Sequence, residues 1–353
     1  MKVYYFPSGG RLTPSSRARI YNLEDWLKSR GVQIGIHEEK PPFHPLDADI
    51  LVYQKVTKPY GIAEKAKKKG IPIIFDCSDV KEGKIKKIAT IANIVTTSSI
   101  PLIENVRSRA DIKDGIVIED PVDYIKGPLP PRIHTKKDDF IIIFTCSRGE
   151  FNTINPAITP LIKLRETVNF EFRYICGENS KWINKRRGGT IKRVNKLGGK
   201  HVCWNIDTFS NEYRNADIAI APQTRMHKTA TKVTLAVAHN LPVVSSWTPS
   251  HLKFARGTGT EEFCVRNDNS KQWYKMLKRL CNPDERNKFL KKTLPYLWRV
   301  HSVEGVGREW LKLFNSLVPE KKRVNLEKRK KRIKKKDKHL HKVKKKKKKV
   351  KKK

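Results

Sequence analysis

The sequence predicts an α/β fold of two domains, each with a parallel sheet covered by helices on both faces. Short apolar segments alternate with helical segments twice, on either side of a proline-rich charged stretch. A chain of 353 residues is long enough for two domains with a core each. We expect a first domain at 1–125, a linker at 126–139 and a second domain at 140–300. A C-terminal helix follows at 301–318, and a lysine-rich tail, expected to be disordered, at 319–353.

The first domain opens with an apolar strand at 3–6 and a turn that contains Gly9 and Gly10. A helix follows, because Thr13 is a preferred capping residue and Gly31 is a typical helix end. Strand, glycine turn and helix open many nucleotide-binding α/β domains, although the pattern G-x-G-x-x-G is absent. The other predicted strands are 32–36, 49–53, 71–77, 93–97 and 115–118, with helices at 62–69 and 100–110.

The second domain repeats this alternation after the linker. Its predicted strands are 140–146, 170–175, 202–204, 217–221, 241–245 and 263–265, with helices that include 155–168 and 271–280. Beyond 282 the pattern is helical up to 314. Ligands of open parallel sheets bind at the carboxyl ends of the strands, so the residues that follow each strand are the candidate site residues.

The charge of the chain indicates a polyanionic partner. The net charge is +41, and the segment from Lys321 onward holds 22 Lys/Arg against 2 Asp/Glu, or +20. The remaining 54 Lys/Arg and 33 Asp/Glu still give +21, so the body is basic as well. Nucleic acid, an anionic membrane surface or an acidic polymer fits this charge, and charge that serves only solubility is the alternative.

Cysteine usage and the N-terminus indicate a cytoplasmic protein. The six cysteines are widely spaced without a C-x-x-C pair, which favours free thiols in a reducing compartment over a zinc site. Pro7 interrupts the first apolar run too early for a signal peptide, and no apolar run approaches bilayer length. The D-x-D pattern at Asp47–Asp49 is superficially similar to a metal-binding motif, but it precedes a strand instead of following one, so we expect no obligatory metal.

The segment Met226–Ser246 contains the strongest candidate for an anion site. Lys228 and Lys232 are four residues apart at a predicted helix start, and such residues share one helix face. A helix start adds unpaired backbone N–H groups, here including that of Thr229, and the positive end of the dipole. Together these groups suit a diphosphate. Two solvated surface lysines are the alternative interpretation.

The order of motifs resembles the GT-B glycosyltransferases, in particular the family-four (group 1) type. In the second domain it is carried by ADIAIAP, HKTATK and AVAHNLPVVSS, with the spacing K-[ST]-x-x-K from Lys228 to Lys232. In the first domain SSRARIYNLEDWLKSRG, DCSD and VIEDPVD are similar to the first helix, a loop after a central strand and the domain exit. The resemblance spans about residues 1–316. It implies two Rossmann-like domains facing a cleft, and a nucleotide-sugar that serves as co-substrate without any cofactor.

One departure from that family concerns the donor ribose. Many members carry E-x7-E, with the second glutamate on the ribose, and the matching positions here are His227 and Leu235. Either the donor is held differently or the chain has lost transfer activity. The intact lysine pair favours the first explanation.

Further candidate residues follow predicted strands. Arg148 comes after the strand that ends at Cys146 and is a third candidate for the donor diphosphate, or a solvated loop arginine. Gly9 and Gly10 are expected to let backbone approach a ligand in the cleft. Asp76 and Asp79 follow a buried strand, where a carboxylate can orient or deprotonate an acceptor hydroxyl. A helix cap or turn is the alternative for both.

A basic stretch at 181–200 contains no acidic residue and is expected to be a glycine-punctuated loop that follows a phosphate backbone. A solvated insertion without a partner is the alternative. The candidate polyanion-binding residues are Lys181, Trp182, Lys185, Arg186, Arg187, Lys192 and Arg193.

These observations predict a glycosyltransferase that passes sugar from a nucleotide-sugar to a hydroxyl acceptor. The charge favours an acceptor on a polyanion such as modified DNA, or one at an anionic membrane surface. The resemblance implies retention of anomeric configuration. A non-catalytic nucleic-acid-binding protein on a degenerate GT-B scaffold is the alternative.

Overall fold

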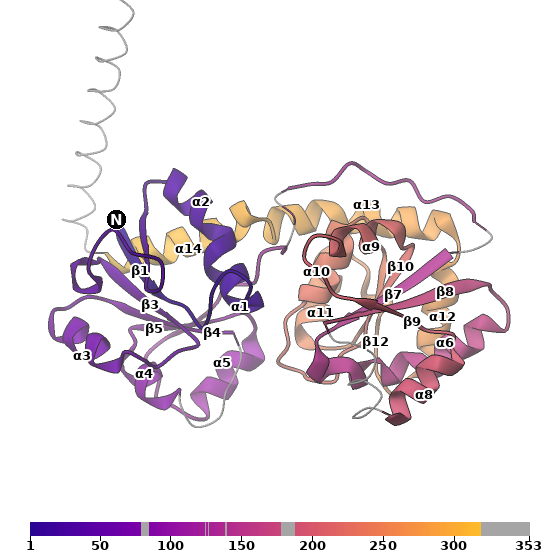
Figure 1. The fold of residues 1–353 in the computed structure, drawn as a ribbon, viewed down its shortest axis with the longest axis horizontal. Helices are drawn as coiled ribbons and strands as arrows, with labels where there is room; N and C mark the ends of the chain where they lie inside the picture. Colours follow the sequence, from indigo (N-terminus) through magenta and orange to yellow (C-terminus); the bar gives the residue numbers. More distant parts are fainter. Residues whose placement is uncertain (79–84, 124, 126, 138–139, 178–187, 319–353) are drawn as a thin grey trace, which may run out of the picture.

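Two six-stranded, wholly parallel sheets form the centres of two lobes (Figure 1). The computed structural model describes residues 1–318 apart from 79–84, 124, 126, 138–139 and 178–187. The predicted tail at 319–353 therefore lies outside the described residues. The two-domain α/β prediction is confirmed.

The first sheet has the order β2-β1-β3-β4-β5-β6. Apart from the edge strand β6, its strands have buried residues on both faces, as expected of a parallel sheet covered by helices. The strands are β1 (Lys2–Phe6), β2 (Gln33–Ile36), β3 (Ile50–Gln54), β4 (Ile73–Cys77), β5 (Ile94–Thr97) and β6 (Gly115–Val117). The helical elements are α1 (Pro14–Ser16), η1 (Arg17–Tyr21), α2 (Asn22–Ser29), η2 (Pro45–Asp47), α3 (Tyr60–Lys68), α4 (Lys86–Ile91) and α5 (Ile100–Arg107).

The second sheet has the order β12-β11-β10-β7-β8-β9. Its strands are β7 (Phe140–Cys146), β8 (Phe170–Cys176), β9 (Lys200–Cys203), β10 (Ile218–Ala221), β11 (Val243–Ser246) and β12 (Cys264–Val265). The helical elements are η3 (Arg148–Ile154), α6 (Asn155–Arg165), α8 (Gly188–Lys196), α9 (Phe209–Asn215), α10 (Thr231–Ala238), α11 (Pro249–Thr258), η4 (Glu261–Phe263), α12 (Ser270–Leu280) and α13 (Pro283–Val300).

Two local expectations need correction. The basic stretch is not a loop throughout, because its part from Gly188 to Lys196 forms the amphipathic helix α8, which buries Ile191 and Val194. The helix that contains Lys232 begins at Thr231, so Lys228 lies in the irregular segment before the helix and not in it.

The C-terminal helix α14 (Val303–Leu317) joins the end of the chain to the first lobe. In Figure 1, α13 runs along the second lobe and α14 continues along the first. Val306, Trp310 and Phe314 of α14 belong to the same apolar cluster as Val3 and Leu27. The two lobes are thus linked at 118–139 and again at the α13–α14 junction. None of the helices within the described ranges is both long and apolar enough to cross a membrane.

Replacing Trp310 with alanine is expected to destabilise the first lobe by about 3–5 kcal/mol, the usual cost of removing a buried aromatic side chain. Trp310 is 1% exposed, and its ring packs on Phe314 and under the Arg19 guanidinium. Urea unfolding followed by fluorescence measures the change. The control, Lys312→Ala, alters an exposed position of the same helix. Equal effects of the two changes would show that α14 is not part of the first core.

Candidate functional site

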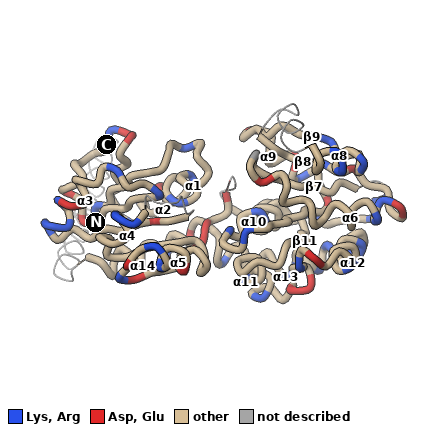
Figure 2. Tube along the Cα trace, turned by 90° about the horizontal axis from the view of Figure 1, so that it is seen from below, with Lys and Arg blue, Asp and Glu red and all other residues tan. Residues whose placement is uncertain are grey.

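The carboxyl ends of strands from both sheets border one cavity of about 450 Å³ between the lobes. Figure 2 shows α10 on the side of the second lobe that faces the first. The first lobe contributes polar groups that include Thr13, Ser15, Lys55 and Ser78, together with Asp120 and Asp123. The second lobe contributes Ser147, Glu150, Gln223, Lys228, Thr229, Thr231, Lys232 and His251.

Lys228 and Lys232 converge at this cavity on the carboxylate of Glu150. Lys228 Nζ is 3.4 Å from Glu150 Oε1, and Lys232 Nζ is 3.3 Å from Glu150 Oε2. Lys232 comes from the first turn of α10, and its Nζ also lies 5.6 Å from the ring centre of Phe144. This Nζ atom is buried and makes no hydrogen bond to any described residue. The two ammonium groups therefore form a site that already holds one anion.

The charge state of Glu150 follows from this contact. Burial acts to raise the pKa of Glu150, but the ammonium groups of Lys232 and Lys228 outweigh burial, and the pKa is lowered. The carboxylate is thus ionised at neutral pH. Burial lowers the pKa of His251, another cavity residue, to about 4, so its imidazole is neutral there.

The ion pairs of Glu150 are expected to stabilise the fold only above the ordinary pKa of a glutamate. Because the pKa is lowered on folding, this stabilisation is present above about 4.5 and is lost as the pH falls through the folded-state pKa. Glu150→Gln should therefore lower the free energy of unfolding by about 1–3 kcal/mol at pH 7. The deficit should shrink below pH 4.5. Urea unfolding of both proteins at pH 7 and below pH 4.5 measures this difference in unfolding free energy. A difference that does not change with pH would contradict the ion-pair explanation.

Thr229 links the lysine segment to the first lobe. It lines a small cavity together with Asp120 of the first lobe, and its Oγ1 lies 2.6 Å from Thr231 Oγ1. Burial raises the pKa of Asp120 and outweighs Arg19 and Thr229, which act to lower it. The sequence predicted a role for the backbone amide of Thr229, and the structure places its side chain beside Asp120 as well.

Asp76 does not reach the cavity. Its side chain is 1% exposed, and its oxygens accept hydrogen bonds from Arg19 at 2.6 and 3.1 Å. Thr96 Oγ1 donates a further bond at 2.8 Å. Arg19 also donates to Asp120 at 3.2 Å and to the Ile118 carbonyl. Asp76 is therefore placed to fix the first helix against the domain exit, and we do not retain it as a catalytic group.

The turn after β1 approaches the cavity through Thr13 and Ser15, and the two glycines do not line it. A Cβ on Gly9 would lie 2.3 Å from Thr13 Oγ1, so this position requires glycine to let Thr13 approach. Gly10 has open space around it. The glycines thus shape the turn and do not themselves border the ligand space.

The remaining candidates are separated from the cavity or lie outside the described residues. Arg148 begins η3, but its side chain is outside the description, as are Asp79 and the residues from 181 to 187. Lys192 and Arg193 lie on α8, and Arg193 donates to Thr159 of α6 at 3.0 Å. Both views place α8 away from the first lobe (Figures 1 and 2).

Sequence reasoning missed Glu150, Lys55 and Arg17. Lys55 lines the cavity from the first lobe in a left-handed conformation, with φ 58°, and its Nζ is 3.4 Å from Ser15 Oγ. Arg17 pairs with Asp123 at 2.8 Å. Only Glu150 could have been selected from the sequence, because it lies in the same segment as Arg148, directly after a buried strand.

The positions matching the family glutamates present no carboxylate. Leu235 is 6% exposed and belongs to the core of the second lobe. The carbonyl of His227 accepts a hydrogen bond from Ser99 Oγ of the first lobe at 3.0 Å. Leu235 therefore packs in the core of the second lobe, and the backbone of His227 contacts the first lobe.

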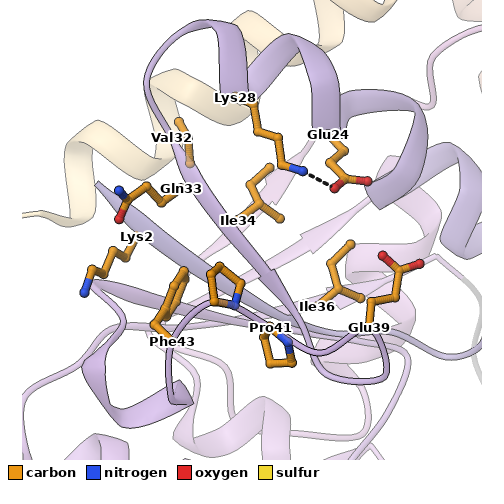
Figure 3. A pocket seen from close by; sticks show the side chains of 11 residues that line it. Lys2, Glu24, Lys28, Val32, Gln33, Ile34, Ile36, Glu39, Pro41 and Phe43 are labelled. Carbon is orange, nitrogen blue, oxygen red and sulfur yellow. Dashed lines mark hydrogen bonds and ion pairs between the residues drawn. The ribbon is translucent and has the colours of Figure 1, made fainter.

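A separate hollow of about 490 Å³ lies on the first lobe beside the edge strand β2 (Figure 3). Ile34, Ile36 and Phe43 line it together with charged side chains. Among these, Glu24 is paired with Lys28 at 2.5 Å. No candidate residue lies in this hollow, so the functional argument rests on the cavity between the lobes.

No protein-family profile and no curated protein matches the sequence. Solved structures do match. A glycosyltransferase from Rickettsia africae aligns with a TM-score of 0.70 and 13% identity, covering 90% of this chain and 99% of that one. Anabaena Alr3699/HepE, solved with UDP and glucose, aligns with a TM-score of 0.69 and 10% identity, covering 90% of this chain and 100% of that one. The sucrose-phosphate synthase of Thermosynechococcus elongatus aligns with a TM-score of 0.62 and 12% identity, covering 90% of this chain and 99% of that one.

These neighbours are GT-B glycosyltransferases, and the chain has the GT-B fold of two Rossmann-like domains. The predicted resemblance is confirmed at the level of the fold. At 10–13% identity the likeness carries no further, so the activity has to be argued from the cavity itself.

Proposed function

We propose that the protein transfers a sugar from a nucleotide-sugar donor to a hydroxyl acceptor. The observation that carries this proposal is the convergence of Lys228 and Lys232 on one anion at the cavity between the lobes. Donor complexes of a neighbour with the same fold support it, since Anabaena HepE was solved with UDP-glucose.

In the proposed reaction the bond between the sugar C1 and the donor diphosphate breaks, and the acceptor oxygen bonds to C1. The acceptor proton leaves with the nucleoside diphosphate. Negative charge grows on the diphosphate as its bond to C1 breaks, and fixed positive groups there lower the barrier. Lys228 and Lys232 supply these groups, so the proposed transfer needs no metal for this purpose.

We propose that the acceptor is anionic and approaches beside α11. A hollow of about 480 Å³ opens there between the lobes and includes the exposed side chains of Ile100 and Trp247. Lys253 and Arg256 border it, and Lys253 contacts Glu119 of the first lobe. An exposed aromatic ring beside cationic groups suits a hydroxylated base in DNA or a glycan carrier at an anionic membrane. We also propose a cytoplasmic location, because the wide spacing of the six cysteines favours free thiols in a reducing compartment.

The proposal is tested by thermal unfolding of the full chain with a panel of nucleotide-sugars that differ in base and sugar. A ligand that binds the folded state raises the melting temperature, by an amount that grows with its concentration above Kd. We expect at least one nucleotide-sugar to do so and to release free nucleotide in an assay with acceptor. If no member of the panel shifts the melting temperature, the enzyme proposal fails.

The second candidate is a non-catalytic protein that binds nucleic acid on this scaffold. It is favoured by Leu235, which places an apolar side chain where the related enzymes carry a ribose-binding glutamate. Tight binding of duplex DNA, without binding of any nucleotide-sugar, would establish this candidate instead.

A further inference from the structure

The carboxylate of Glu150 occupies the place that the proposed function assigns to the donor diphosphate. One of its oxygens faces Lys228 Nζ and the other faces Lys232 Nζ, at 3.4 and 3.3 Å. The Glu150 side chain is 14% exposed, and those of Lys228 and Lys232 are 27% and 19% exposed. A phosphate that bridges the two ammonium groups would have to enter the space that this carboxylate fills.

We propose that Glu150 is a built-in competitor for the donor site, which it occupies in the free protein and leaves when a diphosphate binds. The inference rests on the proposed function. With Glu150 in place the three side chains carry a net charge of +1, whereas without it the lysine pair presents +2. A tethered carboxylate has a high effective concentration, so it lowers the apparent affinity of any ligand that has to displace it. The device therefore weakens the apparent binding of every anion that must displace Glu150, and only anions that bind the lysine pair tightly occupy the site.

The geometry differs from that of a permanent structural ion pair. Charge-assisted N–H···O contacts are typically about 2.7–2.9 Å long, and the buried Arg19–Asp76 pair has such a contact at 2.6 Å. Both contacts of Glu150 are longer, and Lys232 Nζ makes no hydrogen bond to a described residue. The buried ammonium thus retains the capacity to bond a better-fitting anion.

The surroundings of Glu150 leave room for it to move. It lies in the 3₁₀ segment η3, between exposed residues at Ser147 and Gly149 on one side and the cavity of about 450 Å³ on the other. A change in the rotamer of Glu150 would therefore uncover the lysines without a rearrangement of the core.

The test compares the full chain with Glu150→Gln and with the control Glu104→Gln, which removes the same charge at an exposed position of α5. The probes are inorganic pyrophosphate and inorganic phosphate, titrated by calorimetry. Neither contains a nucleotide base, so their binding does not depend on which nucleotide the donor carries. We expect Glu150→Gln to lower the Kd for pyrophosphate about tenfold relative to Glu104→Gln. The Kd for phosphate, if phosphate displaces the same carboxylate, should fall by the same factor, because the fraction of protein with the lysines uncovered is the same for both probes.

A second variant guards against misfolding of the first. Glu150→Asp keeps the charge but shortens the side chain, and it should give an intermediate Kd for pyrophosphate. If pyrophosphate binds wild type and is lost on Lys232→Gln, but neither Glu150 variant binds it more tightly than Glu104→Gln, the competitor inference is wrong while the donor site stands. If pyrophosphate binding is absent from wild type and from all variants, the proposed function itself fails.

Discussion

Lys232→Gln is expected to lower kcat/KM for the nucleotide-sugar donor by about 100- to 1000-fold, the usual effect of removing one group that stabilises transition-state charge. Glutamine keeps a polar side chain, one atom shorter than that of lysine, but removes the positive charge beside the departing diphosphate. Lys232 Nζ is buried, so few water molecules can replace its charge. The rate of nucleotide release at low donor concentration measures the effect.

The control for this prediction is Lys275→Gln, which removes an exposed lysine of α12 in the same lobe. The control should keep kcat/KM within about twofold, because exposed charges are screened by solvent and salt. Lys228→Gln should fall between the two, since the Lys228 side chain is more exposed than that of Lys232. Unchanged turnover by Lys232→Gln would remove the lysine pair from the mechanism.

Asp76→Asn is expected to cost about 3–5 kcal/mol of stability, because it leaves Arg19 buried without its main counter-charge. Both side chains are 1% exposed, and Arg19 joins β4, through Asp76, to the domain exit at Ile118 and Asp120. Urea unfolding of the first lobe measures the loss. Turnover per folded molecule should change by only a few-fold, since Asp76 does not line the cavity.

The matched control is Asp25→Asn, an exposed position of α2 that should leave stability within about 0.5 kcal/mol of wild type. The pair of measurements separates the two interpretations of Asp76. A variant as stable as wild type that has lost turnover would restore Asp76 as a catalytic residue.

The sequence allowed the fold to be predicted because parallel-sheet domains have a strong local signal. Apolar segments such as Phe140–Cys146 are too short for helices and recur between helical periods. The path of α14 was not predicted, because the contact of Trp310 with the first core joins residues about 300 positions apart. Helical periodicity shows that such a face is apolar, but it does not show which lobe it covers.

The candidate site was predicted in part for the same reason. The spacing of Lys228 and Lys232 is local, and the structure brings both to the cavity at which the lobes meet. The partner of the lysines, Glu150, lies more than 70 positions earlier, and no local pattern connects the two segments. Asp76 illustrates the opposite case: an aspartate at a strand end has the pattern of a catalytic group, but Arg19 from a distant helix neutralises it.

A crystal structure of the full chain, with the nucleoside diphosphate that raises its melting temperature most, tests the central claim most directly. The account predicts that the β-phosphate lies within hydrogen-bonding distance of Lys228 Nζ and Lys232 Nζ, with the Glu150 carboxylate turned away from both. A nucleotide bound elsewhere, with Glu150 still between the two lysines, would contradict it.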